Sequence, residues 1–274
     1  MLSLSLMDPL PHIRWFTAAN PGYMTDKGTN QYLLGREEIT VIDVALPTEE
    51  NIAGIMDLAQ AMGGKKIATI LLTHIHRDHL GGALALKEKC GARLGISRSR
   101  AGYLGGEDFT YGDGDRLEYD GGELKVVHTP GHESGHCCFY ETAAQVLFTG
   151  DHILGRGTTV IPPPDGNMIR YLESLRKLLP LKLRLLLPGH GPVINDPYGK
   201  INEYISHRLE REAQVLAALS RGAKTPAEIA ASIYTDIPAA LQRMAQLSVE
   251  AHLIKLSEEK RVERGGDAFS LRAS

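Results

Sequence analysis

The chain has 274 residues, of which 43% are hydrophobic and 23% are charged, and its formal net charge is -3. This length is sufficient for one large hydrophobic core, or for such a core with a small additional domain. The charge excludes a globally basic nucleic-acid-binding protein, although a local basic groove remains open. The cysteines are few and odd in number, at Cys90, Cys137 and Cys138. A disulfide framework is therefore not expected, and a reducing compartment is favoured.

The amino-terminal segment, residues 1–15, has a short apolar start but no basic region, and Pro9 and Pro11 interrupt it. These features do not fit a signal peptide. Apolar runs elsewhere in the sequence fall short of the roughly 18 residues that suggest a membrane-spanning helix. We therefore expect a soluble, cytoplasmic protein that does not bind membranes.

Short apolar runs separated by glycine and proline fill the first two thirds of the chain, and each is typical of a buried strand. The predicted strands cover residues 30–35, 39–45, 66–74, 92–97, 123–132, 136–141, 144–151 and 183–190. Helical spacing of apolar side chains predicts helices over 47–64, 81–91 and 166–180, and Thr48 is the expected N-cap of the first. Strands that alternate with helices and with hairpin-like pairs predict an α/β sandwich.

The pattern becomes helical near Lys200. Helices are predicted over 201–220, 225–234 and 241–259, and a hairpin over 260–272. Thr225, Pro226 and Glu228 form a capping-box pattern at the start of the second of these helices. Three helices followed by a hairpin are the order of a winged-helix unit. We therefore predict a larger domain over residues 1–199 and a small winged-helix-like domain over 200–274.

The charge of this carboxyl-terminal part bears on its partners. Residues 201–274 contain ten Lys or Arg and ten Asp or Glu, so their net charge is zero. Modules that read DNA are usually basic, because they neutralise phosphates. Sequence-specific DNA binding is therefore not expected, and a role in shaping or covering a site is favoured. A regulator that binds nucleic acid remains the alternative, and it predicts tight, salt-sensitive binding to DNA.

The sequence THIHRDHLGG directly follows an apolar run that has the features of a buried strand. It places three imidazoles and one carboxylate within six residues, at His74, His76, Asp78 and His79. This stretch is either a polar loop that is rich in histidine or part of a metal site.

Three later apolar runs also end in one imidazole or carboxylate beside glycine, at His132, Asp151 and His190. Strand ends that converge on one edge of a sandwich would bring all these side chains together. Five histidines and two aspartates suit Zn²⁺, and also Mn²⁺ or Fe²⁺. Two metals that share seven nitrogen and oxygen ligands leave positions open for water, which is the catalytic pattern.

The motifs THIHRDH, TPGH, GD and PGHG, in this order over about residues 25–195, resemble those of the metallo-β-lactamase superfamily. The resemblance implies an αβ/βα sandwich as catalytic domain, and a dinuclear zinc hydrolase whose two metals share a bridging hydroxide. It assigns the first metal to His74, His76 and His132, the second to Asp78, His79 and His190, and a bridging position to Asp151. Asp78 would also orient the nucleophile as the catalytic residue.

The sequences GTNQYLLG, GRGTTV, LLPGHGPVI and INEYISHRLERE, with the winged-helix end, resemble the lactamase-β-like protein 2 group. Its mitochondrial member is an endoribonuclease, which implies the phosphodiester bond of single-stranded RNA as the favoured substrate. A thioester or ester hydrolase related to glyoxalase II, or a lactone hydrolase, is the alternative. The alternative that is not an enzyme is a winged-helix regulator that binds nucleic acid and has a non-catalytic metal site.

Four further residues are candidates for contact with substrate. Arg156 and Thr158 belong to the loop that follows Asp151, whereas His207 and Arg208 are candidate anion-binding groups on a predicted helix. For this helical pair, a solvated helix face is equally consistent with the sequence.

For other residues near the motifs, the sequence is consistent with more than one structural role. Asn30 either braces a loop near the site or belongs to a surface turn. We expect His136 to support the site or to pack in the core, and Cys137 and Cys138 to be buried as small hydrophobic residues. The sequence leaves the oligomeric state open, a homodimer included.

Overall fold

The computed structural model describes residues 10, 12–222 and 224–272, which form two compact units. The first unit comprises residues up to 128 together with 137–156 and 182–195, and the second comprises 129–136, 157–181 and the chain from 196 onward. The amino-terminal nine residues, for which no signal peptide was predicted, lie outside the described residues. The predicted domain boundary after residue 199 stays a prediction.

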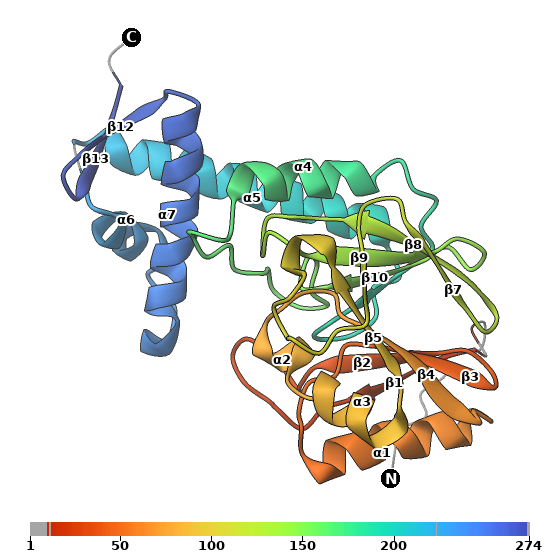
Figure 1. Ribbon diagram of the computed structural model, residues 1–274. Coiled ribbons are helices and arrows are strands. Elements are labelled where there is room, and N and C mark those ends of the chain that lie inside the picture. The colour runs from red at the N-terminus through yellow and green to blue at the C-terminus, as the bar shows by residue number, and fades with distance from the viewer. Residues whose placement is uncertain (1–9, 11, 223, 273–274) are drawn as a thin grey trace. The chain divides into compact units, whose positions relative to one another are not determined.

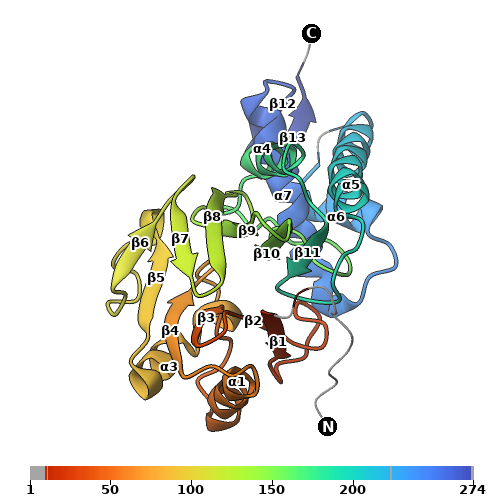
Figure 2. The ribbon, with the colours of Figure 1, turned by 90° about the vertical axis from the view of Figure 1, so that its right-hand side faces the viewer.

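Among the described residues, the first unit contains two β-sheets (Figure 1). The six strands of the first sheet are β1 (Ile13–Thr17), β2 (Asn30–Leu34), β3 (Glu38–Ile42), β4 (Lys66–Leu71), β5 (Arg93–Ser97) and β6 (Phe109–Tyr111). The five strands of the second, in sheet order, are β11 (Leu185–Pro188), β10 (Val146–Gly150), β9 (Cys137–Glu141), β8 (Gly122–His128) and β7 (Arg116–Tyr119). Figure 2 shows the strands of each sheet side by side in this order. The eight predicted strands are confirmed, whereas β1, β6 and β7 were not predicted.

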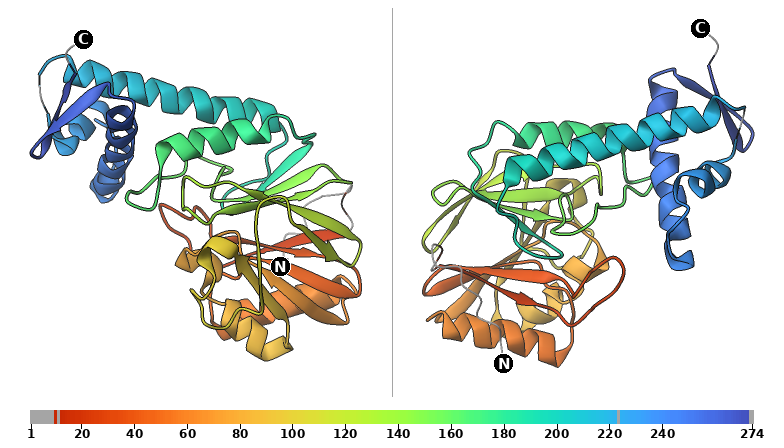
Figure 3. Two further views of the ribbon diagram at one scale, coloured as in Figure 1. Left: turned by 45° about the horizontal axis from the view of Figure 1, so that its top comes forward. Right: turned by 180° about the vertical axis from the view of Figure 1, so that it is seen from behind.

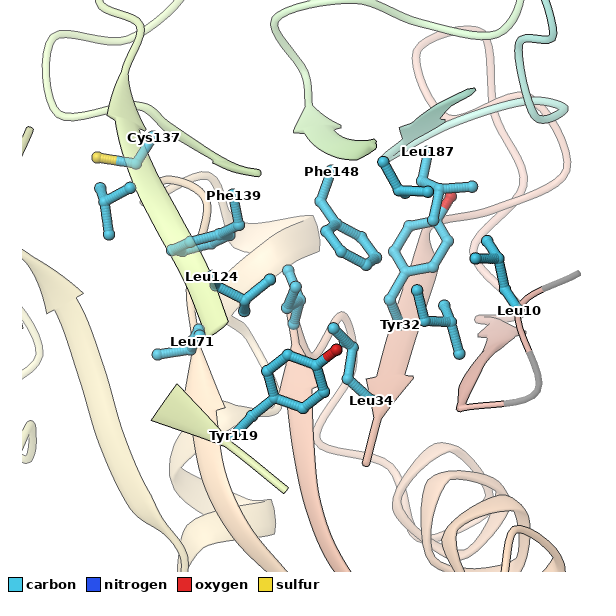
Figure 4. Packing of buried hydrophobic residues seen from close by; sticks show 14 of the residues in the cluster. Leu10, Tyr32, Leu34, Leu71, Tyr119, Leu124, Cys137, Phe139, Phe148 and Leu187 are labelled. Atoms are coloured by element: carbon cyan, nitrogen blue, oxygen red, sulfur yellow. The ribbon is translucent and has the colours of Figure 1, made fainter. Parts of the chain in front are cut away.

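The two sheets of this unit enclose a hydrophobic core (Figure 4). Leu34 and Leu71 contribute to it from the first sheet, and Phe139 from the second. The rings of Tyr32 and Phe148 meet edge-on, with their centroids 5.2 Å apart. Edge-to-face contact is a favourable geometry for aromatic rings, so this pair helps to fix one sheet on the other.

Two helices cover the other face of the first sheet, as Figure 1 shows for α1 (Glu49–Ala61) and α3 (Ala83–Cys90). The side chain of Thr48 accepts a hydrogen bond from the backbone N–H of Asn51, which confirms the predicted N-cap. Ile52 and Ile55 then point into a core that includes Leu33 on β2. This packing gives the first sheet an apolar layer on both faces.

The strand directions bring several chain segments to one edge of the unit. Strands β3, β4 and β5 are parallel to one another, and β10 is parallel to β11. The motif THIHRDH follows β4 and includes the short helix α2 (Arg77–Leu80), while Asp151 follows β10 and His190 follows β11. An isolated bridge between Thr29 and His190 brings the start of β2 to the same place.

The second unit is mainly helical. It contains α4 (Met168–Leu178), α5 (Pro197–Leu219), α6 (Pro226–Ile233) and α7 (Gln242–Glu258), followed by the hairpin β12 (Val262–Gly265) and β13 (Ala268–Leu271). Thr225 and Glu228 form the predicted capping box, and the predicted hairpin is confirmed. Figure 3 shows the long helix α5 beside α4. None of the helices in the described parts of the chain is long and apolar enough to span a membrane.

Candidate metal centre

A buried carboxylate fixes the segment that leads into the histidine motif. Asp43, at the end of β3, is 2% exposed and accepts hydrogen bonds from the backbone N–H and the hydroxyl of Thr73, at 2.7 and 2.8 Å. The Thr73 hydroxyl lies 3.0 Å from Nδ1 of His74, and Nε2 of His74 lies 3.0 Å from Nδ1 of His76. The two imidazoles therefore present nitrogens to one common point.

The same carboxylate orients His79. Nδ1 of His79 lies 2.7 Å from Oδ2 of Asp43, so the imidazole donates from Nδ1 and presents Nε2 as the nitrogen that could coordinate a metal. Nε2 of His79 lies 3.2 Å from both Nε2 of His190 and Oδ1 of Asp151. Asp43 thus sets the ring orientation of one predicted ligand.

His190 is oriented in a similar way by the backbone. Its Nδ1 lies 3.2 Å from the carbonyl oxygen of Gly28, while its Nε2 lies 3.2 Å from both Oδ2 of Asp78 and Oδ1 of Asp151. The preceding residue has to be glycine, because a Cβ at Gly189 would lie 2.9 Å from Oδ1 of Asp151 and closer still to the ring of His79. The absent side chain lets the loop approach the ligands.

One complete ligand set lies within the first unit. Ligand atoms of Asp78, His79, Asp151 and His190 all lie within 4.8 Å of one another. Asp151 is also within this distance of His74 and His76, so its carboxylate is common to both groups. The donors are nitrogen and oxygen only, and the distal nitrogens of His79 and His190 are held by hydrogen bonds, which fits a divalent cation.

His132 belongs to the second unit, in the segment 129–136. Its Nδ1 lies 2.6 Å from the carbonyl oxygen of Val160 and 3.1 Å from the hydroxyl of Thr159. Donation from Nδ1 leaves Nε2 for coordination, as in His79 and His190. Its membership of the first ligand set stays a prediction.

The charges of the site favour ionised carboxylates. Burial alone would raise the pKa of Asp151, but the imidazoles of His190 and His79 outweigh it and hold this pKa well below its usual range. Burial lowers the pKa of His190, yet the carboxylates of Asp151 and Asp78 raise it to about 9. The pKa of His79 is also raised, because Asp151 and Asp43 outweigh burial. Metal ions must therefore compete with protons for these nitrogens.

This competition predicts the pH dependence of the metal-free protein. The pKa of His190 is about 9 in the folded protein and about 6.5 in the unfolded chain. The stabilisation that comes from protonated His190 is therefore wholly present below pH 6.5 and is lost as the pH rises through 9. We expect the free energy of unfolding to fall by a few kcal/mol as the pH rises from 6.5 through 9. Thermal unfolding in a chelator across this range measures the effect. His190→Ala is the control, and an equally steep decline in this variant would contradict the assignment.

The predicted substrate-contacting residues have different surroundings. Arg156 is exposed, and its guanidinium lies 3.5 Å from the carboxylate of Asp26. The neighbouring Gly155 donates its backbone N–H to the carbonyl of His190, at 2.8 Å, so Arg156 is next to the loop of a predicted ligand. Thr158 is half-buried and belongs to the second unit.

The helical pair departs from the alternative of a solvated helix face. Arg208 on α5 is only 2% exposed, and its guanidinium donates to the carbonyl of Thr159 and lies over the ring of Tyr171. His207 is half-buried, and burial, with the cations Arg208 and Arg211, lowers its pKa to about 4. The solvated helix face is therefore wrong for Arg208, because its buried guanidinium contacts Thr159 and Tyr171 within the second unit. Contact of either residue with substrate stays a prediction.

Sequence reasoning missed one functional residue and left another undecided. Asp43 was not singled out, although it directly follows the last residue of β3, just as Asp151 directly follows the last residue of β10. Asn30 braces the loop of His190, so the surface-turn alternative is wrong; it is 5% exposed. His136 is fully buried, with Nδ1 2.8 Å from the hydroxyl of Thr129.

Comparison with known families gives matches to both parts of the chain. Residues 24–190 match the family described as metallo-β-lactamase superfamily. Residues 225–270 match the family described as β-lactamase associated winged helix domain. The first match includes all seven predicted metal ligands, and the second covers the capping box and most of the hairpin.

Individual proteins are similar over most of their length. A "Beta-lactamase-like protein 2 homolog" from Caenorhabditis elegans is 34% identical, over 89% of this chain and 83% of that protein. An "Atrochrysone carboxyl ACP thioesterase" from Aspergillus fumigatus is 31% identical, over 92% of this chain and 83% of that protein. A crystal structure of a metallo-β-lactamase family protein from Thermus thermophilus superimposes with a TM-score of 0.81 at 27% identity, covering 96% and 99% of the two chains.

Proposed function

Because the chain belongs to the metallo-β-lactamase superfamily and has its fold, with a carboxyl-terminal winged helix domain, we propose that it is a dinuclear zinc hydrolase. The observation that carries this proposal is the position of the Asp151 carboxylate. Its Oδ1 lies 3.2 Å from Nε2 of His79 and of His190, and a carboxylate oxygen of Asp151 also lies within 4.8 Å of ligand atoms of His74 and His76. A shared carboxylate suits two cations side by side. His132 would complete the first ligand set.

The residues of the site divide the work of hydrolysis. Two bound divalent cations would supply an acidified water and stabilise negative charge on the reacting centre. Asp43 and the Gly28 carbonyl hold the rings of His79 and His190 in the coordinating orientation. Asp78 has the most exposed side chain of its ligand set, 31%, and its pKa is lowered: burial opposes ionisation, but His190 and His79 outweigh it. The lowered pKa supports an ionised Asp78, to which we assign the orientation of the nucleophile and the acceptance of a proton.

We propose the phosphodiester bond of single-stranded RNA as the first candidate substrate. The similarity to β-lactamase-like protein 2 homologues from two animals, each at 34% identity, supports this choice. The overall charge of -3 argues against broad electrostatic capture of RNA. Contacts would then be local, and Arg156 is the exposed cation beside the His190 loop.

A thioester is the second candidate, because a relative of 31% identity is named a carboxyl ACP thioesterase. The same ligand set serves attack on a carbonyl or on a phosphorus centre. Esters and lactones share this carbonyl chemistry. A DNA-binding regulator is disfavoured by the intact donor set and by the zero net charge of residues 201–274. A cytoplasmic location stays a prediction from the sequence, and the oligomeric state stays open, a homodimer included.

The test is a comparison of substrates with zinc-loaded and metal-free protein. Labelled single-stranded RNA, an acyl thioester and a lactone are incubated with each form and with Asp78→Ala, and kcat/KM is measured. Zinc-dependent RNA cleavage that is lost in the variant supports the first candidate. Thioester or lactone turnover without RNA cleavage replaces the substrate and keeps the hydrolase. Absence of turnover, together with salt-sensitive DNA retention in a gel shift, would overturn the enzyme assignment.

A further inference from the structure

The loop that carries His190 is held by side chains from β2. The amide nitrogen of Asn30 donates to two carbonyl oxygens at once, those of Pro188 at 3.0 Å and Gly191 at 2.9 Å. The backbone N–H of Asn30 donates to the carbonyl of Gly189 at 2.7 Å. The hydroxyl of Tyr32 adds a bond of 2.8 Å to Pro188. Both ends of the four-residue loop are therefore fixed by one amide.

The orientation of this amide is itself determined. The hydroxyl of Thr17 donates to Oδ1 of Asn30 at 2.9 Å, which leaves the NH₂ group facing the two carbonyls. Asn30 is 5% exposed, so water does not readily replace it as a donor. Without the amide, the carbonyls of the buried Pro188 and the half-buried Gly191 would each lose a hydrogen bond. The loop would keep the bonds from the Asn30 backbone to Gly189 and from Tyr32 to Pro188, but it would lose the amide that joins its two ends.

Loss of the Asn30 hydrogen bonds should affect only the group of candidate ligands that includes His190. His190 lies between the two clamped carbonyls, and its ring is also held by the Gly28 carbonyl. His74 and His76 follow β4 and are held by Thr73 and Asp43 instead. Loss of the Asn30 clamp should therefore weaken the set of His190 and leave that of His74 and His76 in place.

We propose that Asn30 is a positioning residue for the second metal. Its bidentate amide closes the 188–191 loop before any cation binds, so that His190 needs little ordering on coordination. This inference rests on the proposed two-metal function. Outer partners of metal ligands commonly change metal affinity by about 10–100-fold. Asn30→Ala should weaken the second of two binding events by this factor, with a smaller effect in Tyr32→Phe.

The experiment is a titration of metal-free protein with Co²⁺, followed by visible absorption, alongside zinc content and thermal unfolding. His190→Ala identifies the binding event that depends on the second site. The matched control is Asn51→Ala, which removes another buried amide, 3% exposed, that bonds to Gln31 and to the carbonyl of Leu46. Asn51→Ala should lower the thermal stability while both affinities stay unchanged.

The outcomes separate this inference from the function on which it rests. Selective loss of the second affinity in Asn30→Ala, with the first unchanged, supports the positioning role. Equal affinities in the variant and the wild type would overturn it, even if the variant is less stable. If the wild-type protein itself binds fewer than two Co²⁺ ions, the dinuclear function fails instead. Tyr32→Phe keeps the test decisive if Asn30→Ala does not fold, because it removes a single loop bond.

Discussion

Replacement of Asp151 by alanine should remove the binding of both metals and lower kcat/KM by at least about 10³-fold, or ~4 kcal/mol of transition-state stabilisation. The reason is the shared position of this carboxylate. Its Oδ1 lies 3.2 Å from Nε2 of His79 and of His190, and it also belongs with His74 and His76. Its removal leaves each set one ligand short and the imidazoles without their main counter-charge.

Metal content and steady-state kinetics of Asp151→Ala, measured on the same preparation, test this expectation. Asp151→Asn keeps the volume and one oxygen but lacks the charge, so it should retain part of the metal. Asp120→Ala is a control, since the half-buried Asp120 accepts hydrogen bonds from the backbone of Glu37 and Glu38 and belongs to neither group of candidate ligands. Two tightly bound metals per chain in Asp151→Ala would show that this carboxylate is not a shared ligand.

The sequence was sufficient for the strands that are buried on both faces. Strands β2, β9 and β10 are buried at every position, and such strands are continuous apolar runs. Strands β7 (RLEY) and β6 (FTY) were missed, because they are short, lie at sheet edges and leave most positions partly exposed. An edge strand gains its structure from a neighbour rather than from its own pattern.

The candidate metal ligands could be proposed from the sequence because each motif that contains them closely follows an apolar run. Their supporting groups could not, because support depends on contacts between segments far apart in sequence. Asn30 reaches the 188–191 loop from the other sheet, and nothing in its local sequence distinguishes this from a turn. Arg208 lies at helical spacing from Ile201 and Tyr204 on the buried face of α5. Its charge nevertheless favours a solvated position in the sequence, whereas the carbonyl of Thr159 and the ring of Tyr171 contact its guanidinium in the structure.

The second large expected effect is a loss of metal affinity when the carboxylate of Asp43 is replaced. Asp43→Asn tests it with a side chain of nearly the same shape. Asp43 has a φ of 62°, a left-handed conformation that asparagine tolerates as well as aspartate does. Asp43→Asn should therefore add no backbone strain that would contribute to the measured change. The carboxylate accepts three hydrogen bonds, two from Thr73 and one from Nδ1 of His79. An amide has one accepting oxygen and one donating nitrogen, so it cannot accept all three.

Either orientation of the new amide damages the site. If its nitrogen faces His79, the imidazole must accept at Nδ1, and the proton moves to Nε2, the atom that faces His190 and Asp151. If its nitrogen instead faces the backbone N–H of Thr73, two buried donors face each other and neither has an acceptor. An unsatisfied buried donor costs about 1–3 kcal/mol of stability. We expect the second metal affinity to fall by about 10–100-fold, and kcat/KM to fall with it.

Zinc affinity, kcat/KM and the free energy of unfolding of Asp43→Asn should be measured beside those of Thr73→Val. The valine variant removes the hydroxyl bond to Asp43 and the hydroxyl contact with Nδ1 of His74, and it leaves the contact between Asp43 and His79 intact. It should lose stability while keeping most of its second-site affinity. If the two variants lose stability alike and bind zinc alike, Asp43 supports the fold only. A selective loss of zinc in Asp43→Asn, restored at high zinc concentration, would show that this carboxylate fixes the tautomer of His79 for coordination.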